Sequence, residues 1–437
     1  MTSEELVNSI AVPASEAVKQ VRSNDTIFIG MTSNQVVDLN EALYARREEL
    51  ENITLLSSIL LRPTSLFFGK DAAKTFSLLT PFYGPLEKKA GQAGLHCEFT
   101  SCHLSELDYW FRWTSKPTVA FLAVSMPDEE GYVSFGPSGY CLYPTLLKYV
   151  DRVIVEIIPD MPYVYSDPAY RFHLKDADAV VLSSASVVSV PTEPESEEAK
   201  AISGFLMDLI PDGATIQLGI GNLSTAIGKG LHSKNDLGVF SELFSSPIAD
   251  LIRSGNVTNK KKGFMDGISV YGFALGDTAM YELMDHNESI RSLPFTFVND
   301  PRNVGKNKNM ISVNTAMSVN LYGEVAAEAM GFSQHSAVGG QIDFVKGAQW
   351  SEGGKSIIAL NSTYSDKNGR HSKIVLDFPT GTPVTTPRSE VQYVATEYGC
   401  IDLKALPMRE RVHAMISLAH PDFREELADQ AKAAGIY

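Results

Sequence analysis

Thr215-Ile-Gln-Leu-Gly-Ile-Gly-Asn222, followed by Thr225-Ala-Ile-Gly-Lys-Gly-Leu231, is the stretch of sequence that decides the fold. A short apolar run leads into glycines, and apolar residues then recur at helical spacing. This pattern predicts a β-strand, a tight turn and an amphipathic helix. Thr26-Ile-Phe-Ile-Gly-Met-Thr-Ser-Asn34 with Val36-Val-Asp-Leu-Asn-Glu-Ala-Leu43 shows the same pattern earlier in the chain. We therefore expect two similar halves, although any two strand–helix units share such a pattern.

Strand-like and helical segments alternate along the rest of the chain. Apolar strand-like runs lie at 119–124, 152–158, 179–183, 269–273, 356–360, 374–377 and 391–395. Such alternation predicts mostly parallel sheets with helices on both faces. Val190-Pro-Thr-Glu-Pro-Glu-Ser-Glu-Glu198 has the composition of a linker. We therefore expect an α/β fold of two similar open domains, an N-terminal one over 1–189 and a C-terminal one over 190–437.

Composition restricts the class of protein. The chain has 437 residues, of which 44% are hydrophobic, so it can bury the cores of two or three domains. Its net charge of -15 disfavours nucleic acid as a partner, because phosphate binding needs clustered Lys and Arg. The sequence has no run of eighteen or more uncharged apolar residues, which argues against a membrane span. The first residues, Met1-Thr-Ser-Glu-Glu-Leu-Val7, lack the pattern of a signal peptide, so we expect a cytoplasmic protein.

The cysteines do not form a recognisable metal site. The chain has four of them, Cys97, Cys102, Cys141 and Cys400, and none belongs to a C-x-x-C pair. Cys97 and Cys102, with His96 and His103 beside them, come closest to a ligand pattern, but their spacing does not fit zinc. We therefore expect reduced thiols and no bound metal.

One acidic residue stands out, Glu242, in Leu237-Gly-Val-Phe-Ser-Glu-Leu-Phe-Ser-Ser-Pro247. The apolar residues 237–240 predict a buried strand, and Glu242 lies where that strand should end. A glutamate taken alone is usually a solvated surface group. A carboxylate at the carboxyl edge of a sheet, with glycine-rich turns nearby, favours use as a nucleophile.

Two glycine-rich segments could bring backbone N–H groups to a ligand. Gly219-Ile-Gly-Asn-Leu-Ser-Thr-Ala-Ile-Gly228 would place a helix N-terminus against a phosphate, pyrophosphate or carboxylate, although its spacing departs from a dinucleotide-binding fingerprint. The adjacent glycines of Val338-Gly-Gly-Gln-Ile-Asp-Phe344 would form an oxyanion hole. Ordinary tight turns explain both segments equally well. Asn314 could position a carboxylate through its amide, or could bond a turn or a cap. Arg388 and His420 we expect in structural roles, as an ion pair and as a cap or packing residue.

At these residues the chain resembles the acetyl-CoA hydrolase/transferase group of the family I CoA-transferases, particularly the 4-hydroxybutyrate and butyryl-CoA:acetate CoA-transferases. The resemblance implies two similar open α/β domains with the active site at the cleft between them. The chain departs from the family pattern at two places. It has Phe240-Ser241 where the family usually has His-Thr before the glutamate, and Val319-Asn320 where the family commonly has Val-Asp. The segment between the glycine turn and Glu242 also looks shorter. The matching stretches are Met126–Ser138, Gln217–Asn222, Val338–Gly347, Val384–Glu390 and Ala395–Gly399.

The resemblance also implies roles for individual residues. Glu242 matches the catalytic glutamate, which forms a glutamyl-CoA thioester, and Gly340 matches a CoA-contacting backbone N–H of oxyanion type. Met317 falls at another CoA-contacting position. Apart from the resemblance, the symmetry of the two halves suggests that Met31 helps shape the acyl pocket, although core packing explains it as readily, and the amide of Asn314 would contact the substrate. The expected CoA-binding turn comprises Gly219, Ile220, Gly221, Asn222 and Leu223.

The expected function is that of a CoA-transferase. It would move CoA from a short-chain acyl-CoA, of the butyryl-CoA or 4-hydroxybutyryl-CoA type, to a carboxylate such as acetate, in a ping-pong reaction. Coenzyme A would be a substrate, acyl-CoA and small carboxylic acids the partners, and no metal would take part. Relatives imply a homodimer or homotetramer. The alternatives are an acetyl-CoA hydrolase on the same scaffold and a non-catalytic regulator that binds CoA or a sugar phosphate.

Overall fold

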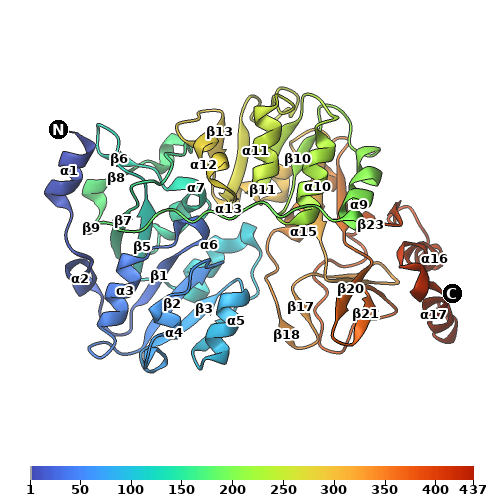
Figure 1. Ribbon diagram of the computed structural model, residues 1–437, viewed down its shortest axis with the longest axis horizontal. Coiled ribbons are helices and arrows are strands. Elements are labelled where there is room, and N and C mark those ends of the chain that lie inside the picture. The colour runs from blue at the N-terminus through green and yellow to red at the C-terminus, as the bar shows by residue number, and fades with distance from the viewer. Residues whose placement is uncertain (1) are drawn as a thin grey trace. The chain divides into compact units, whose positions relative to one another are not determined.

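The computed structural model describes residues 2–437, which divide into two compact units (Figure 1). The described part of the first unit consists of residues 2–191 and Val270–Val298, and the second unit consists of Thr192–Ser269 and Asn299–Tyr437. The first change of unit falls inside the predicted linker. Val270–Val298 also belongs to the first unit. The predicted ranges 1–189 and 190–437 do not include this segment in the first domain.

The first unit is built on a seven-stranded sheet in which each pair of neighbouring strands is parallel. Figure 1 shows its strands side by side in the order given by their pairing. Almost every side chain of its central strands is buried, which explains why they read as continuous apolar runs. In sheet order the strands are β4 (His96–Phe99), β3 (Phe76–Thr80), β2 (Ile53–Ser58), β1 (Thr26–Met31), β5 (Val119–Val124), β7 (Arg152–Ile157) and β9 (Ala179–Leu182).

Helices and short strands complete the first unit. α3 turns Leu39 and Leu43, one helical turn apart, into the core beside the sheet. The helices are α1 (Ser3–Ile10), α2 (Ala14–Ala17), α3 (Asp38–Ala45), α4 (Ser65–Phe68), α5 (Pro85–Gln92), α6 (Leu107–Tyr109), α7 (Gly136–Gly139), α8 (Tyr143–Leu146), α12 (Thr278–Met284) and α13 (Phe295–Val298). The short strands are β6 (Tyr132–Val133), β8 (Phe172–His173), β12 (Ser269–Ala274), which starts one residue before the unit resumes, and β13 (Ile290–Ser292).

Strands of the second unit lie side by side in an eight-stranded sheet, in the order β11-β10-β14-β19-β23-β24. Only β24 is antiparallel to its neighbour, because a turn of two residues, Glu397 and Tyr398, joins it to β23. The strands are β10 (Thr215–Gln217), β11 (Gly238–Phe244), β14 (Met310–Thr315), β19 (Lys355–Ala359), β23 (Tyr393–Thr396) and β24 (Gly399–Asp402).

The helices of the second unit are α9 (Glu197–Met207), α10 (Asn222–Leu231), α11 (Ser246–Arg253), α14 (Pro301–Val304), α15 (Gln341–Trp350), α16 (Met408–Leu418) and α17 (Pro421–Ala433). Small strands outside the main sheet are β15 (Ser318–Asn320), β16 (Val325–Ala326), β17 (Ala329–Met330), β18 (Ser333–Gln334), β20 (Thr363–Asp366), β21 (Gly369–Ser372) and β22 (Ile374–Val375). Among residues 2–437, no helix combines the length and apolar character that crossing a bilayer requires.

The two units share a topology. In each, the first strand (β1 or β10) lies inside the sheet, the second (β2 or β11) pairs with it on one side, and a later strand (β5 or β14) pairs with it on the other. The prediction of an α/β fold with two similar, mostly parallel open domains is thus confirmed. An active site at the cleft between them stays a prediction.

A buried carboxylate closes the N-terminus of α3 in the first unit. Glu156, on β7, is fully buried, and its oxygens accept hydrogen bonds from the backbone N–H groups of Val37, Asp38 and Leu39 at 2.9, 3.3 and 2.9 Å. The hydroxyl of Ser183, just after β9, donates to it at 2.7 Å. The side chain therefore ties two strand ends to the helix N-terminus, whose N–H groups would otherwise lack acceptors.

Glu156→Ala should lower the free energy of unfolding by about 3 kcal/mol or more, because it leaves several buried donors without an acceptor. Glu156→Gln keeps one carbonyl oxygen and should cost less. Urea denaturation measures both, with the exposed Glu129→Ala as control. An alanine variant as stable as the parent would contradict this account.

Candidate functional site

Glu242 lies within β11 and not at its end. The predicted strand stops near Phe240, but the chain stays extended to Phe244 because Leu243 and Phe244 are also buried. The last residue of β11 that pairs with β10 is Val239. Glu242 therefore lies beyond the paired part of β10, at the edge where parallel strands of α/β sheets present their ligand sites.

Two groups from distant parts of the chain hold the Glu242 carboxylate. The Asn299 side-chain N–H donates to Glu242 Oε2 at 2.7 Å, and the backbone N–H of Gly340 also donates to the carboxylate. A Cβ atom on residue 340 would overlap both Glu242 Oε2 and Asn299 Nδ2. Only glycine therefore allows the backbone to approach the carboxylate this closely.

The carboxylate has an altered acidity. Burial raises the pKa of Glu242 to about 7, against the opposing effect of the hydrogen bonds from Asn299 and Gly340, which favour the charged form. Gly340 is also the residue that precedes the first turn of α15, so the positive end of a ten-residue helix faces the charge. At neutral pH the group is thus available as a carboxylate that is poorly solvated, which suits a nucleophile.

Gln341 anchors the start of α15 to the sheet. Its side-chain N–H donates to the carbonyl of Thr315 at 2.9 Å, and its side-chain oxygen accepts from the hydroxyl of Thr386 at 2.9 Å. Thr315 ends β14, and Thr386 belongs to the Val384–Glu390 segment. One glutamine therefore joins three separate motifs and fixes where the Gly340 N–H points.

Asn299 is held by the short helix that follows it. Asp300 caps α14 by accepting from the Arg302 N–H at 2.9 Å. α14 packs against α15 at Gly347, where a Cβ atom would overlap Val304. The sequence analysis missed Asn299, which is 57 residues from Glu242. The Asp300-Pro301 helix start was the one visible signal there, and it does not reveal the contact.

The glycine turn after β10 leaves a helix N-terminus open. Gly221, with φ of +97°, precedes α10, and no side chain caps this ten-residue helix. Leu223 is buried in the turn, whereas Ile220 is 49% exposed. The corresponding helix of the first unit, α3, has its N-terminal N–H groups occupied by Glu156. The open N–H groups of α10 can therefore donate hydrogen bonds to an anionic group, and the role of this turn in CoA binding stays a prediction.

Buried polar atoms without protein partners lie on β10 and β14 and, in addition, on Asn299. Within residues 2–437 they include Gln217 Oε1, Ser312 Oγ, Asn314 Nδ2 and Asn299 Oδ1. Gln217 pairs directly with Ser312, and Asn314 follows on the same face of β14. Buried groups of this kind normally find a partner, so they mark places where a bound molecule or water can donate or accept.

The remaining predicted residues have the following positions. The backbone N–H of Met317 donates to the carbonyl of Ala326 at 2.9 Å, just beyond the end of β14. Met31 ends β1, is 1% exposed and lies with its sulfur 3.7 Å from that of Cys141. Contacts of Met317 with CoA, of Met31 with the acyl group and of Asn314 with the substrate stay predictions. The amide that holds Glu242 belongs to Asn299.

The two departures from the family pattern have structural explanations. Phe240 is fully buried with its ring centroid 6.0 Å from that of Phe264, and the Ser241 hydroxyl donates to the Leu243 carbonyl at 2.7 Å. Asn320 Oδ1 accepts from the Tyr322 and Glu324 N–H groups and closes a turn. Aspartate has the same oxygen, so the replacement preserves that turn.

The expected structural roles of Arg388 and His420 are confirmed. Arg388 lies 3.8 Å from Glu324, with its guanidinium over the ring of Tyr322. His420 precedes α17 and caps it by accepting from the Asp422 N–H. Among residues 2–437, no group of three or more His, Cys, Asp or Glu side chains is placed to hold a metal ion.

Gly340→Ala should abolish activity, because the added methyl displaces the Glu242 carboxylate or the Asn299 amide. We expect a loss of at least about 100-fold in turnover, the usual effect of misplacing a reacting group. Gly204→Ala is the matched control, since a Cβ atom there meets nothing within 4 Å in helix α9. Steady-state rates of both variants decide the matter, and an active Gly340→Ala would contradict the geometry.

Glu242→Gln should stabilise the protein at pH 8. Folding raises the carboxyl pKa from 4.5 to about 7, so the parent loses stability as pH rises from 4.5 to about 7, whereas glutamine does not ionise. We expect a gain of up to about 3 kcal/mol at pH 8 and little change at pH 5. Thermal denaturation at both pH values measures it, and equal effects at the two would disprove the shifted pKa.

Comparison with known proteins identifies the family. The family of acetyl-CoA hydrolase/transferase N-terminal domains matches residues 9–191, and that of the C-terminal domains matches residues 276–431. Butyryl-CoA:acetate CoA-transferase of Anaerostipes caccae is 34% identical over 97% of this chain and 96% of its own length. 4-Hydroxybutyrate coenzyme A transferase of Clostridium kluyveri is 34% identical over 98% and 99%.

A solved structure agrees with these matches. The crystal structure of RipA from Yersinia pestis superimposes with a TM-score of 0.93 at 31% identity and covers 100% of both chains. The predicted resemblance is thus confirmed over the whole chain. The glutamate and the asparagine are in contact at the edge of the second sheet, next to the glycine. On the family and sequence matches, this protein belongs to the acetyl-CoA hydrolase/transferase family and is a CoA-transferase.

Proposed function

We propose that the protein transfers CoA from a short-chain acyl-CoA to a carboxylate acceptor through a thioester on Glu242. The observation that carries this proposal is the Glu242 carboxylate itself, held by Asn299 and Gly340 with its pKa raised to about 7. A surface carboxylate with an ordinary structural role has no need of this placement. Covalent storage on Glu242 would conserve the energy of the thioester without ATP or a metal.

The reaction would run in four steps. The first two load CoA onto Glu242, and the last two repeat them in reverse order with the acceptor acid. Glu242 attacks the acyl-CoA carbonyl, the C–S bond breaks, and CoA thiolate leaves behind a mixed anhydride. The thiolate attacks the γ-carbonyl of Glu242, which gives glutamyl-CoA and releases the first acid as a carboxylate. An acceptor carboxylate then attacks glutamyl-CoA, and the expelled thiolate attacks the new anhydride. The products are the new acyl-CoA and free Glu242.

Gly340 and Asn299 would serve different stages of this cycle. Both donate to the free carboxylate, and the Asn299 bond fixes Oε2. When the thiolate attacks the Glu242 carbonyl of the anhydride, and when the acceptor attacks glutamyl-CoA, negative charge develops on the Glu242 carbonyl oxygen. The Gly340 N–H, at the N-terminus of α15, is then placed to stabilise that charge.

The residues around the second sheet fit coenzyme A. The uncapped N-terminus of α10 supplies N–H groups for a phosphate, and the exposed Ile220 offers an apolar contact beside it. Gln217 and Asn314 hold an unpartnered acceptor and an unpartnered donor, which complement the N–H and C=O of an amide such as those of the pantetheine arm. No step of the chemistry depends on a metal.

Small aliphatic acids are the substrates that the relatives suggest. Butyrate, acetate and 4-hydroxybutyrate are named for two proteins 34% identical to this one, and succinyl-CoA and cyclohexane-1-carboxylate for a third of the same identity. A panel of acyl-CoA donors against carboxylate acceptors, scored by mass spectrometry for exchanged products, would rank them. We expect C2 to C4 acids to exchange fastest. Preference for a long-chain or aromatic acid would overturn that assignment and leave the role of Glu242 intact.

Hydrolysis is the second candidate, because the family includes hydrolases. Release of CoA without an added carboxylate, at a rate equal to the transfer rate, would favour it. A transferase must exclude water from both intermediates, so we expect hydrolysis to be at least about 100-fold slower than transfer.

Substitution of Glu242 tests the proposed chemistry. Glu242→Ala and Glu242→Gln should lower the exchange rate by at least about 1,000-fold, because both lack the nucleophile. CoA binding measured by calorimetry should persist. The rate of the parent's first half-reaction should rise with pH around 7, as the carboxylate forms. If either variant exchanged CoA at the rate of the parent protein, the proposal would be refuted. That result would support a non-catalytic, CoA-binding regulator.

A further inference from the structure

A buried lysine is bonded to the strand that carries Glu242. Lys262 belongs to the 258–268 loop, which precedes β12, and among residues 2–437 it is the only lysine that is buried. Its side-chain nitrogen donates to the carbonyl of Val239 at 3.1 Å and to that of Ile268 at 2.5 Å. Val239 is the last residue of β11 that pairs with β10, three residues before Glu242. Lys262 therefore holds β11 at the point where its pairing ends.

The same loop also bonds the backbone N–H of Val239. Asn259 Oδ1 accepts from this N–H at 2.9 Å, and Asn259 Nδ2 donates to the Ser269 hydroxyl at 2.9 Å. A Cβ atom on Gly238 would overlap the stem of Lys262, so only glycine lets the lysine lie this close to the strand. At Val239, two side chains thus supply the donor and the acceptor that a buried backbone requires.

The amine of Lys262 has enough hydrogens for both of its bonds in either protonation state. Burial lowers the pKa of Lys262 to about 7, and Asp266 acts in the opposite direction. An ammonium group carries three hydrogens and a neutral amine two, and the acceptors are two carbonyls. A buried amine costs free energy unless it is hydrogen-bonded, so these two bonds account for a lysine at this position.

The 258–268 loop also contacts the chain that follows α14. The Lys262 carbonyl accepts from the Lys308 N–H at 2.6 Å. The ring centroid of Phe264 lies 6.0 Å from that of Phe240 and 4.9 Å from the Lys306 ammonium. One loop is therefore in contact with β11 and with the segment just after α14.

These contacts extend to Asn299. The Lys306 ammonium donates to Asn303 Oδ1 at 2.9 Å. Asn303 belongs to α14, which begins two residues after Asn299. Asn299 in turn donates to the Glu242 carboxylate at 2.7 Å. The 258–268 loop thus joins the strand of the carboxylate to the helix beside its amide partner.

We infer that Lys262 is a positioning residue for the reaction at Glu242, because it fixes β11 relative to the segment of Asn299. This inference rests on the proposed function of Glu242 as the nucleophile. Lys262 bonds backbone carbonyls only, and it acts on the carboxylate through the strand. A reacting group that is displaced by a fraction of an ångström reacts more slowly, although the substrate still binds.

Lys262→Met tests the inference, because methionine keeps an unbranched apolar stem and removes both hydrogen bonds. We expect kcat for CoA exchange to fall at least about 10-fold while KM for acyl-CoA stays within about twofold. Lys261→Met is the matched control, since the neighbouring Lys261 is exposed and pairs with Asp236 at 2.7 Å. An unchanged kcat in Lys262→Met, or a change in KM alone, would overturn the inference.

A second readout needs no turnover and separates this inference from the proposed chemistry. With 15N-labelled asparagine, the Asn299 side-chain amide should titrate near pH 7 by NMR, because its partner Glu242 has its pKa raised to about 7. Lys262→Met should shift or abolish this titration, and Lys261→Met should keep it. An unchanged titration in Lys262→Met contradicts the inference even where Glu242 forms a CoA adduct. A parent protein without the adduct refutes the proposed function, and the titration then still tests the positioning.

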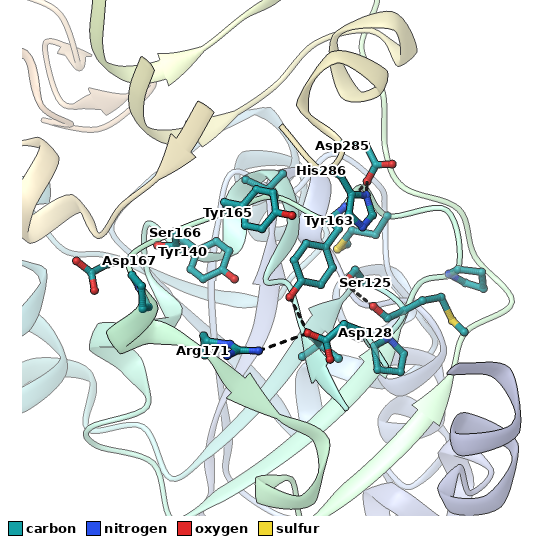
Figure 2. A pocket seen from close by; sticks show the side chains of 17 residues that line it. Ser125, Asp128, Tyr140, Tyr163, Tyr165, Ser166, Asp167, Arg171, Asp285 and His286 are labelled. Carbon is teal, nitrogen blue, oxygen red and sulfur yellow. Dashed lines mark hydrogen bonds and ion pairs between the residues drawn. The ribbon is translucent and has the colours of Figure 1, made fainter. Parts of the chain in front are cut away.

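Loss of stability alone needs its own control. In the first unit, Asp285 accepts from the Tyr163 N–H at 2.7 Å and lies 3.0 Å from His286 Nδ1, at a cavity of about 500 Å³ (Figure 2). No residue of the 258–268 loop lines that cavity, and neither does Glu242. Asp285→Ala should therefore lower Tm and leave kcat unchanged. An equal fall of kcat in this variant would show a general effect of stability and refute the inference.

Phe264→Leu decides the matter if Lys262→Met does not fold. It keeps both bonds of Lys262 and removes the ring that lies between Phe240 and Lys306. We expect kcat to fall several-fold with KM unchanged. A kcat equal to that of the parent protein would count against the inference.

Discussion

The contact between Glu242 Oε2, the Asn299 amide and the backbone of residue 340 is the constraint on which the site depends. These three groups occupy a space with no room for one further carbon atom. Glycine at 340 is therefore a requirement of geometry, and the start of α15 must be fixed to within a fraction of an ångström. Gln341, through its bonds to Thr315 and Thr386, supplies that fixation. Asn299 is fixed in turn by the packing of α14, which follows it, against Gly347 of α15.

The two units share a topology but differ at the N-terminus of the helix that follows the first strand. In the first, Glu156 fills the N-terminus of α3 and makes it a structural joint. In the second, β19 carries Lys355–Ala359, with no acidic residue, and the N-terminus of α10 stays open. A repeated strand–turn–helix has thus been closed by an internal carboxylate in one copy and left without a side-chain cap in the other, where we propose that an external anion binds. The same physical interaction, an anion against backbone N–H groups, explains both.

Local pattern predicted much of this arrangement. The strand–glycine–helix units, the parallel sheets and the cap at His420 follow from residue spacing and turn chemistry, which act over a few residues. Asn299, Glu156 and the length of β11 do not follow from it, because each depends on tertiary contacts between segments far apart in sequence. β11 was predicted too short because Glu242 was taken as a strand end, whereas burial of Phe244 carries the strand past it.

The central claim is that Glu242 becomes covalently linked to CoA. Mass spectrometry of peptides from the protein after incubation with acyl-CoA, without an acceptor acid, tests it most directly. The account predicts a CoA adduct on the peptide that contains Glu242, which disappears when an acceptor carboxylate is added. Turnover without any such adduct, or an adduct on another residue, would contradict it.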